Sequence, residues 1–415
     1  MVDLMRNEDE KTQEPAIDAS AKREIAASVQ NISKSFGETS ILNNVTFDVA
    51  KGESLVLLGA SGSGKTTILR IIAGLEQPDS GKVFLQGTDV TDLPARERNV
   101  GVIFQDYALF PLMTVEQNIA YGLRLRKRSS KEVKETVERL LTLVRLEEHR
   151  GKYPSQLSGG QRQRVAIART LAYEPRVLLF DEPFGALDVH TRVRLRREIL
   201  ALLREVKVPA IFITHDQEEA LDLGDRIAVL NAGQLEQVGT PDEVYNRPET
   251  EFVATFLGAA NLLLGVVGQN TVEIGAVAVV IPPQESARFR RGQAVKLIFR
   301  PEDVCLSRTG AIPEDCERLA SGIVDEINFV GAYERLVIRL DLIERQTPEG
   351  KPPLYDVSLS TRDKRTGIPI VMTRTKAEAS AQPLAVGDRV ATGLRAFRIL
   401  PNYALASQRS SRVEG

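Results

Sequence analysis

The chain has 415 residues, enough for two or three domains, and its 54 Lys and Arg residues nearly balance its 56 Asp and Glu residues, giving a net charge of −2. Because the charges balance, there is no electrostatic reason to expect the chain to bind a polyanion, so no nucleic-acid partner is predicted. The hydrophobic fraction of 42% is typical of a globular chain, and apolar runs such as 275–281 are far shorter than the roughly 18–20 residues that span a bilayer. Any membrane role must therefore come through partner proteins.

The ends of the chain and its cysteines offer little chemistry. Residues 1–24 are polar and lack the apolar core of a secretory signal, which predicts a disordered leader on a protein that stays in the cytosol. Residues 407–415 are predicted to form a loose tail. The two cysteines, Cys305 and Cys316, lack the neighbours of a metal site, so we expect free reduced thiols.

Residues 25–260 alternate short apolar runs with helical patterns, which predicts an α/β domain. The runs 54–58, 177–180 and 210–213 end in Gly or polar residues, as buried parallel strands do. Helical spacing of apolar residues predicts two amphipathic helices on this sheet, one carrying Val133, Val137, Leu140, Leu141 and Val144 and the other Leu195, Ile199, Leu202, Leu203 and Val206.

A candidate phosphate-binding loop follows the first of these strands and leads into a helix. Its residues are Gly59, Ala60, Ser61, Gly62, Ser63, Gly64, Lys65, Thr66 and Thr67. The glycines let backbone N–H groups turn inward around phosphate oxygens, and the helix N-terminus adds its dipole. Lys65 is predicted to reach the β- and γ-phosphates, and the Thr66 hydroxyl to bind Mg²⁺.

A pair of acidic residues ends the second predicted strand. Asp181 and Glu182 follow the run 177–180 and so lie at the carboxyl edge of the sheet, where ligands bind in open α/β folds. Phosphoryl transfer asks a protein mainly for positioning and charge stabilisation. We therefore predict Asp181 as a Mg²⁺ partner and Glu182 as the base acting on the attacking water.

A second anion-binding helix start is predicted at Ser158, Gly159, Gly160 and Gln161. The chain has only one phosphate loop and one acidic pair, so this second anion-binding element has no second nucleotide site of its own. The simplest explanation is a head-to-tail homodimer, in which this element of one copy covers the γ-phosphate held by the other copy.

Taken together, these motifs resemble the ATP-binding cassette ATPases. The resemblance covers residues 25–260 and is carried by 59–66, by LSGGQ at 157–161 followed by QRQR, by FDEP at 180–183, by ALD at 186–188 and by Thr214-His215-Asp216. It implies a P-loop fold with a helical subdomain at about 106–175, and ATP hydrolysis with Mg²⁺.

The resemblance also assigns roles that spacing alone does not give. Gln105 is similar to the glutamine that senses Mg²⁺ and the attacking water, and His215 to the switch histidine that contacts the γ-phosphate. Asp188 is similar to a dimer-contact aspartate, and Phe36 to the aromatic residue that stacks on adenine. The segment 107–115 resembles the part of importer cassettes that grips a cytoplasmic helix of the transmembrane subunit.

The pattern of apolar residues changes after about residue 260. Alternating apolar residues at 295–299 and 336–342 predict strands, so residues 261–415 are predicted to form a β-rich, barrel-like domain. The runs 292–300 and 387–395 share Gly, Val and Arg in one register, which hints at a duplicated half-barrel. Residues 299–303 resemble the C-terminal regulatory domain of importer cassettes, whereas 343–380 has no counterpart in that family.

We therefore predict the ATPase subunit of an import complex: a homodimer at the cytoplasmic face of the membrane, with two transmembrane permease subunits and an extracytoplasmic solute-binding protein. The stretch 182–220 looks most like cassettes for sulfate- or molybdate-type anions, with polyamine and ferric-ion importers as alternatives. A non-transport cassette ATPase acting on ribosomes or DNA is the rival class. It is disfavoured because the chain has a single cassette and no heptads. An exporter cassette is disfavoured by the C-terminal domain.

Overall fold

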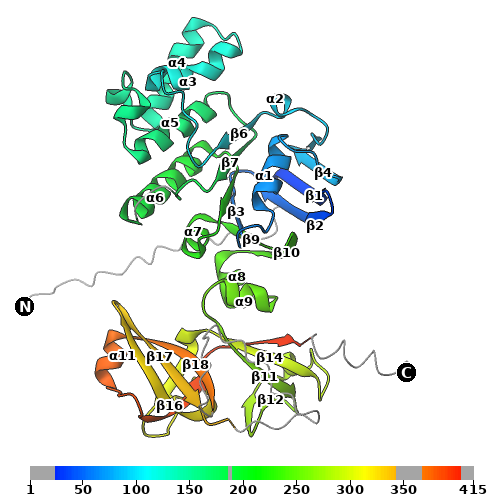
Figure 1. The fold of residues 1–415 in the computed structure, drawn as a ribbon, viewed down its shortest axis with the longest axis vertical. Helices are drawn as coiled ribbons and strands as arrows, with labels where there is room; N and C mark the ends of the chain where they lie inside the picture. Colours follow the sequence, from blue (N-terminus) through cyan, green and yellow to red (C-terminus); the bar gives the residue numbers. More distant parts are fainter. Residues whose placement is uncertain (1–23, 186–188, 343–366, 403–415) are drawn as a thin grey trace, which may run out of the picture.

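The structure, a computed structural model, describes residues 24–185, 189–342 and 367–402. The predicted leader up to residue 23, the segment 343–366, the predicted tail and Asp188 lie outside these residues. An α/β region and a β-rich region are joined through two short helices, α8 (Pro241–Asn246) and α9 (Glu251–Phe256), which lie between them (Figure 1). Within the described residues, no helix combines the length and apolar character needed to cross a membrane.

A six-stranded sheet forms the centre of the α/β region. Its order is β10 (Gln234–Gly239), β9 (Arg226–Asn231), β3 (Ser54–Leu58), β8 (Ala210–Thr214), β7 (Val177–Asp181) and β6 (Val100–Ile103), parallel except for β10. All three predicted strands are confirmed as β3, β7 and β8. Leu55 and Leu57 enter one hydrophobic core and Val56 and Leu58 the other, so both faces are covered and the strands read as unbroken apolar runs.

One face of this sheet packs against α1 (Lys65–Ala73) and an antiparallel sheet. The antiparallel sheet has the order β2 (Thr39–Ala50), β1 (Ile25–Phe36), β4 (Ser80–Leu85) and β5 (Thr88–Asp89), and α2 (Ala95–Arg98) follows it in the chain. The sequence pattern singled out none of these strands. Register shifts between β1 and β2, for example between Val29 and Ile32, break the period-two alternation that marks a regular strand.

The opposite face is covered by helices α3 (Val115–Leu125), α4 (Ser130–Leu143), α5 (Gly159–Leu171), α6 (Val189–Val206) and α7 (Gln217–Leu223), with 3₁₀ turns η1 (Glu147–His149) and η2 (Pro154–Gln156). Both predicted amphipathic helices are confirmed, as α4 and α6. Ser129 and Glu132 form a capping box that fixes the start of α4. Helices α3, α4 and α5 form a lobe at the end of the sheet (Figure 1).

The β-rich region has two five-stranded antiparallel sheets around one core. The first has the order β13 (Val277–Val280), β12 (Thr271–Ile274), β11 (Asn261–Val267), β14 (Ala294–Phe299) and β20 (Arg398–Pro401). The second has the order β15 (Val304–Ser307), β19 (Arg389–Leu394), β16 (Glu317–Val330), β17 (Tyr333–Leu340) and β18 (Ile368–Thr375). Shorter elements are α10 (Pro283–Ser286), η3 (Pro301–Asp303) and α11 (Lys376–Ala381).

The two sheets confirm the internal duplication. Strands β11 to β15 and β16 to β20 follow the same plan, because the fourth strand of each half pairs with the first and the fifth crosses to the other sheet. The matching glycines, Gly292 and Gly387, precede the two fourth strands, and both have positive φ angles of 82° and 94°. Each half therefore completes the sheet of the other.

The expectation of free thiols is wrong, because Cys305 and Cys316 form a disulfide. Strands β15 and β16 flank opposite sides of β19, and Val304 and Glu317 both pair with Leu394. The two cysteines are brought together by a third strand far away in the sequence. Their spacing alone carries no signal of this pairing.

Candidate functional site

The loop 59–64 is held between β2 and the turn after β9. A Cβ atom on Gly59 would lie 2.2 Å from the carbonyl oxygen of Leu230, and one on Gly64 would lie 2.5 Å from a methyl carbon of Leu42. Gly64 also has a φ of 100° and forms the N-cap of α1. These positions require glycine for steric reasons, and they aim the N-terminus of α1 out of the sheet edge.

Lys65 is buried at the start of α1, and its side chain folds back over the loop. Its ammonium group donates hydrogen bonds to the carbonyl oxygens of Gly59 and Ala60, both at 2.8 Å. Burial lowers the pKa of Lys65, and the nearby carboxylates of Glu182 and Asp181 oppose this shift. The cation and the acidic pair therefore lie close enough to influence one another electrostatically.

Asp181 and Glu182 lie at the carboxyl end of β7. Burial raises the pKa of Asp181, and the neighbouring charge of Glu182 raises it further. Glu182 has a φ of 46°, in the left-handed region that non-glycine residues seldom adopt, and its N–H donates to the carbonyl oxygen of Ile213 at 3.1 Å. The unusual backbone turns the Glu182 side chain away from the strand direction and toward β8.

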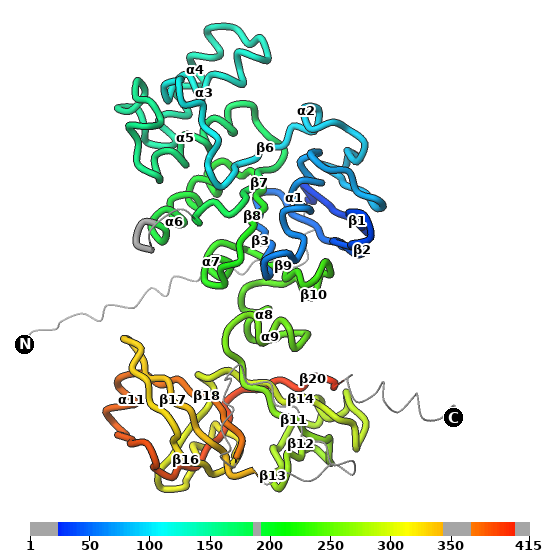
Figure 2. The backbone as a smooth tube through the Cα atoms, in the orientation of Figure 1, coloured from blue at the N-terminus to red at the C-terminus, as the bar shows by residue number. Residues whose placement is uncertain are grey.

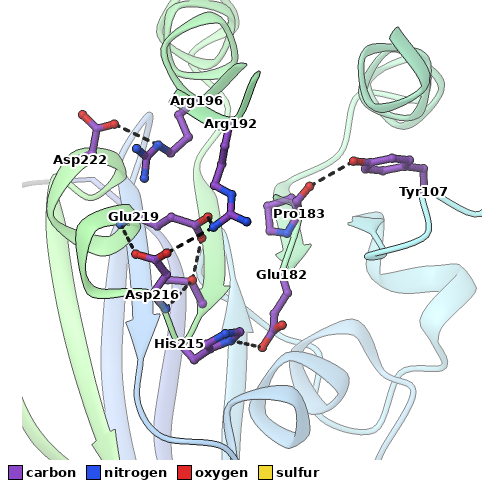
Figure 3. Close-up of polar contacts among 10 residues, drawn as sticks. Tyr107, Glu182, Pro183, Arg192, Arg196, His215, Asp216, Glu219 and Asp222 are labelled. Atoms are coloured by element: carbon purple, nitrogen blue, oxygen red, sulfur yellow. Dashed lines mark hydrogen bonds and ion pairs between the residues drawn. The ribbon is translucent and has the colours of Figure 1, made fainter. Parts of the chain in front are cut away.

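His215 follows β8 and faces Glu182 (Figure 3). Its Nδ1 lies 3.0 Å from Glu182 Oε1, and the imidazole is largely exposed. The next residue, Asp216, accepts a hydrogen bond from the Glu219 N–H and caps α7. The Thr214 hydroxyl donates to the buried Glu219 carboxylate at 2.7 Å. The turn that carries His215 is therefore fixed on both sides.

Gln105 follows β6, on the far side of β7. A Cβ on Gly185 would lie 3.1 Å from its side-chain nitrogen, so the amide lies against the segment after Glu182. Tyr107 is buried, and its hydroxyl donates to the Pro183 carbonyl oxygen at 3.4 Å (Figure 3). The strand ends of β6, β7 and β8 thus bring Gln105, Glu182 and His215 to one edge of the sheet.

Ser158 and Gln161 form a capping box at the start of α5. The Gln161 N–H donates to Ser158 Oγ at 3.3 Å, and the Ser158 N–H donates to Gln161 Oε1 at 2.9 Å. Gly159 and Gly160 form the first turn. The apolar residues of α5 and of α1 belong to different cores, on opposite faces of the central sheet. The structure of one chain therefore does not gather this helix start with the phosphate loop.

Phe36 lies at the end of β1, and half of its surface is exposed (50%). The ammonium group of Lys34 lies 5.1 Å from the centre of its ring. The ring is thus available for stacking, on the sheet that also carries Leu42 against the phosphate loop. Asp188, the remaining predicted site residue, lies outside the described residues.

Sequence reasoning missed several residues that shape this site. Arg192 on α6 forms ion pairs with Asp216 and Glu219, next to the turn that carries His215 (Figure 3). Arg98 is fully buried beneath the C-terminus of α1. No local motif marks either arginine, because each acts on a segment that is distant in sequence.

The fold and the site together define a P-loop ATPase. A sequence profile described as ABC transporter matches residues 42–185. The sulfate/thiosulfate import ATP-binding protein CysA of Acinetobacter baylyi is 53% identical over 291 residues, 68% of this chain and 82% of that protein. The spermidine/putrescine import ATP-binding protein PotA of Thermotoga maritima is 45% identical over 322 residues, 76% of this chain and 86% of that protein.

A solved structure of cbiO1 from Clostridium perfringens, described as part of the ABC transporter complex cbiONQ, superposes with a TM-score of 0.50 and 27% identity. The match covers 53% of this chain and 90% of that one. The chain belongs to the ATP-binding cassette (ABC) transporter family. Within that family it is an ATP-hydrolysing subunit of the importer branch.

Proposed function

We propose that two copies of this chain form a head-to-tail homodimer that binds ATP between the loop 59–67 of one copy and residues 158–161 of the other. The dimer acts at the cytoplasmic face of a membrane and drives two permease subunits, which import a solute delivered by an extracytoplasmic binding protein. The contact of His215 with Glu182 beside the phosphate loop is the observation that supports this proposal most directly.

The residues around the loop fit a bound Mg²⁺–ATP complex. Burial first, and the neighbouring charge of Glu182 second, raise the pKa of Asp181, and a bound cation would offset both effects. Thr66 in the first turn of α1, Asp181 and Gln105 are the proposed residues around the metal, and Mg²⁺ would neutralise charge on the β- and γ-phosphates. Lys65 would exchange its loop carbonyl partners for phosphate oxygens, and Phe36 would stack on the adenine.

Glu182 is proposed as the base. Its carboxylate takes a proton from a water molecule as the water oxygen attacks the γ-phosphorus and the bond to the bridging oxygen of ADP breaks, which yields ADP and phosphate. His215 is proposed to hold Glu182 through Nδ1 and to face the γ-phosphate with its other nitrogen. The 3.0 Å contact supports this pairing.

The dimer is supported by the separation, within one chain, of the helix start at Ser158 from the phosphate loop. The helix start at Ser158 offers N–H groups and a positive dipole end, yet α5 and α1 pack in different cores. A second copy would bring that helix start over the γ-phosphate. Asp188 is proposed to lie in the same interface.

The segment 107–115 is proposed to contact a permease subunit. Leu112 is 89% exposed, although Asn118 beneath it is fully buried and holds the turn in place. An exposed apolar side chain on a well-ordered turn fits a binding surface for a partner helix.

Sulfate or a related oxyanion is the proposed solute, because the sulfate/thiosulfate importer ATPase is 53% identical to this chain and the polyamine importer ATPase 45%. Uptake of labelled sulfate by cells lacking this chain should return when it is supplied and should stay absent with the Lys65→Ala variant. Restoration of putrescine uptake alone would instead support the polyamine importer.

The Glu182→Gln variant tests the assignment of the site. It keeps the shape of the side chain but removes the carboxylate, so ATP should still bind while turnover falls by about 10²–10⁴-fold. Size-exclusion chromatography with ATP and Mg²⁺ should show a persistent dimer that ADP does not support. Glu218→Gln, an exposed neighbour of the same type on α7, is the matched control. Turnover near the wild-type rate in Glu182→Gln would refute the assignment.

A further inference from the structure

Gly258 connects the ATPase site to the β-rich region. It lies between α9 and β11 and has a φ of 94°. Its N–H donates to the side-chain oxygen of Gln217 at 3.0 Å. Gln217 is the first residue of α7, two positions after His215. A single hydrogen bond therefore joins the turn that carries His215 to the segment that enters the β-rich region.

Arg300 holds the other side of this junction. It follows β14 in the β-rich region, is 5% exposed, and donates to the carbonyl oxygen of Ala254 at 2.7 Å and to that of Tyr245 at 2.6 Å. These carbonyls lie in α9 and α8, the two helices between the regions (Figure 2). The guanidinium also stacks 4.1 Å from the centre of the Tyr245 ring, and the Tyr245 hydroxyl donates to Glu302 at 2.7 Å.

Gly258 lies close to both Arg300 and Tyr245. A Cβ on Gly258 would lie 3.3 Å from a ring carbon of Tyr245 and 3.4 Å from Arg300 Nη1. An ion pair of Lys296 with Glu251 adds a second tie between β14 and α9. The position of Gly258, and with it the N–H donor to Gln217, is thus set by how the β-rich region packs on α8 and α9.

At its other end, Gln217 follows a turn that is held together by hydrogen bonds to the start of α7. Asp216 caps α7, and Thr214 is tied to Glu219 on the first turn of that helix. A shift of the start of α7 therefore carries His215 with it, toward or away from Glu182. Small displacements of groups that orient a reacting water change rates strongly.

We propose that Gln217 is a positioning residue for His215. The packing of the β-rich region on α8 and α9 then affects ATP hydrolysis through the Gln217–Gly258 hydrogen bond. This inference rests on the role proposed above for His215. The Gln217–Gly258 hydrogen bond would be the physical link between the C-terminal region and ATP hydrolysis.

The test uses the full chain and compares Gln217→Met with Gln217→Glu. Methionine keeps the size of the side chain but offers no oxygen, so kcat should fall by about fivefold while the KM for ATP stays within about twofold of the wild type. Glutamate keeps an acceptor for the Gly258 N–H and should restore most of kcat. A melting temperature close to that of the wild type would show that Gln217→Met folds normally.

Gln237→Met is the matched control. Gln237 is buried and, like Gln217, bonds backbone groups with its side chain, because it accepts from the Glu249 N–H at 2.9 Å and donates to the Arg247 carbonyl oxygen at 3.1 Å. Among the described residues, neither of these bonds involves the His215 turn. Its loss should lower the melting temperature and leave kcat unchanged, and an equal drop in kcat would overturn the proposal.

A second set of variants separates this inference from the proposed function. If Gln217 acts through His215, then Gln217→Met should lower kcat no further in a His215→Ala background. Arg300→Lys should lower kcat in the wild type and add nothing to Gln217→Met. Additive losses would refute the link. An unchanged kcat in His215→Ala would refute the role of His215 itself, whereas a loss there with wild-type kcat in Gln217→Met would refute the positioning role alone.

Discussion

Arg98 offers a sharp test of what holds the phosphate-loop helix in place. It is fully buried, and its guanidinium donates to the carbonyl oxygens of Ile71 at 2.6 Å, Thr91 at 2.6 Å and Leu93 at 2.8 Å. Burial lowers the pKa of Arg98. Gly74, the left-handed C-cap of α1, leaves the space for this side chain, since a Cβ there would lie 2.5 Å from Arg98 Nε.

The expected cost of Arg98→Met follows from these contacts. A hydrogen bond from a charged group is worth about 1.5–3 kcal/mol, so three short ones contribute roughly 5–9 kcal/mol, from which several kcal/mol of guanidinium desolvation are subtracted. Methionine recovers the desolvation but leaves the carbonyl oxygens without these donors. The free energy of unfolding should fall by about 3 kcal/mol, which lowers the melting temperature by roughly 6–12 °C for a domain of this size.

Thermal unfolding followed by circular dichroism, with and without Mg²⁺–ATP, measures this effect. Arg96→Met is the matched control, because Arg96 lies on the same short helix with a side chain that is 83% exposed and is expected to change stability very little. An Arg98→Met chain that melts within about 2 °C of the wild type would mean that water or neighbouring groups replace the lost donors, and the reasoning would be wrong.

Two further predictions concern the site itself. Because burial and Glu182 raise the pKa of Asp181 above its unfolded value, its charge opposes folding at neutral pH, and the penalty disappears as the pH falls through the raised pKa. Asp181→Asn should therefore have a higher melting temperature than the wild type at neutral pH without nucleotide, and this difference should shrink in acid. The variant should also lose ATP hydrolysis. A difference in melting temperature that grows in acid would contradict the predicted sign. Ser158→Arg should leave ATP binding intact in a filter assay but lower hydrolysis by at least about tenfold, since the bulky cation would fill the anion site facing the partner copy; loss of binding would mean that Ser158 serves its own chain.

The sequence predicts the parts of this protein that are local. Strands β3, β7 and β8 are recognisable because burial on both faces makes each a short unbroken apolar run. The phosphate loop is recognisable because its glycines and Lys65 are contiguous. The duplication in the β-rich region is visible from Gly292 and Gly387, since each half needs the same turn before its fourth strand.

What the sequence does not reveal depends on contacts between distant segments. The Cys305–Cys316 disulfide depends on β19 lying between β15 and β16. Glu182, which has a left-handed backbone, is tied to the end of β8 by a hydrogen bond to the carbonyl oxygen of Ile213. The bond from Gly258 to Gln217 spans 41 positions. In each case a neighbour that no local pattern names decides the geometry.

In the segment proposed to contact the permease, Leu112 is expected to contact the partner and Asn118 to hold the turn in shape. Two variants distinguish these roles. Asn118 accepts from the Phe110 N–H at 2.9 Å and donates to the carbonyl oxygens of Met113 and Thr114, both at 3.0 Å. Asn118→Ala removes these bonds to partly buried backbone groups and should cost about 2–3 kcal/mol. Leu112→Ser removes only an exposed side chain and should leave the melting temperature unchanged. Both variants should reduce co-purification with the transmembrane subunits of the complex and leave ATP binding by the free chain intact. If Leu112→Ser assembles as well as the wild type, the exposed leucine does not contact the permease, and the turn at 110–114 matters only for the stability of the helical lobe.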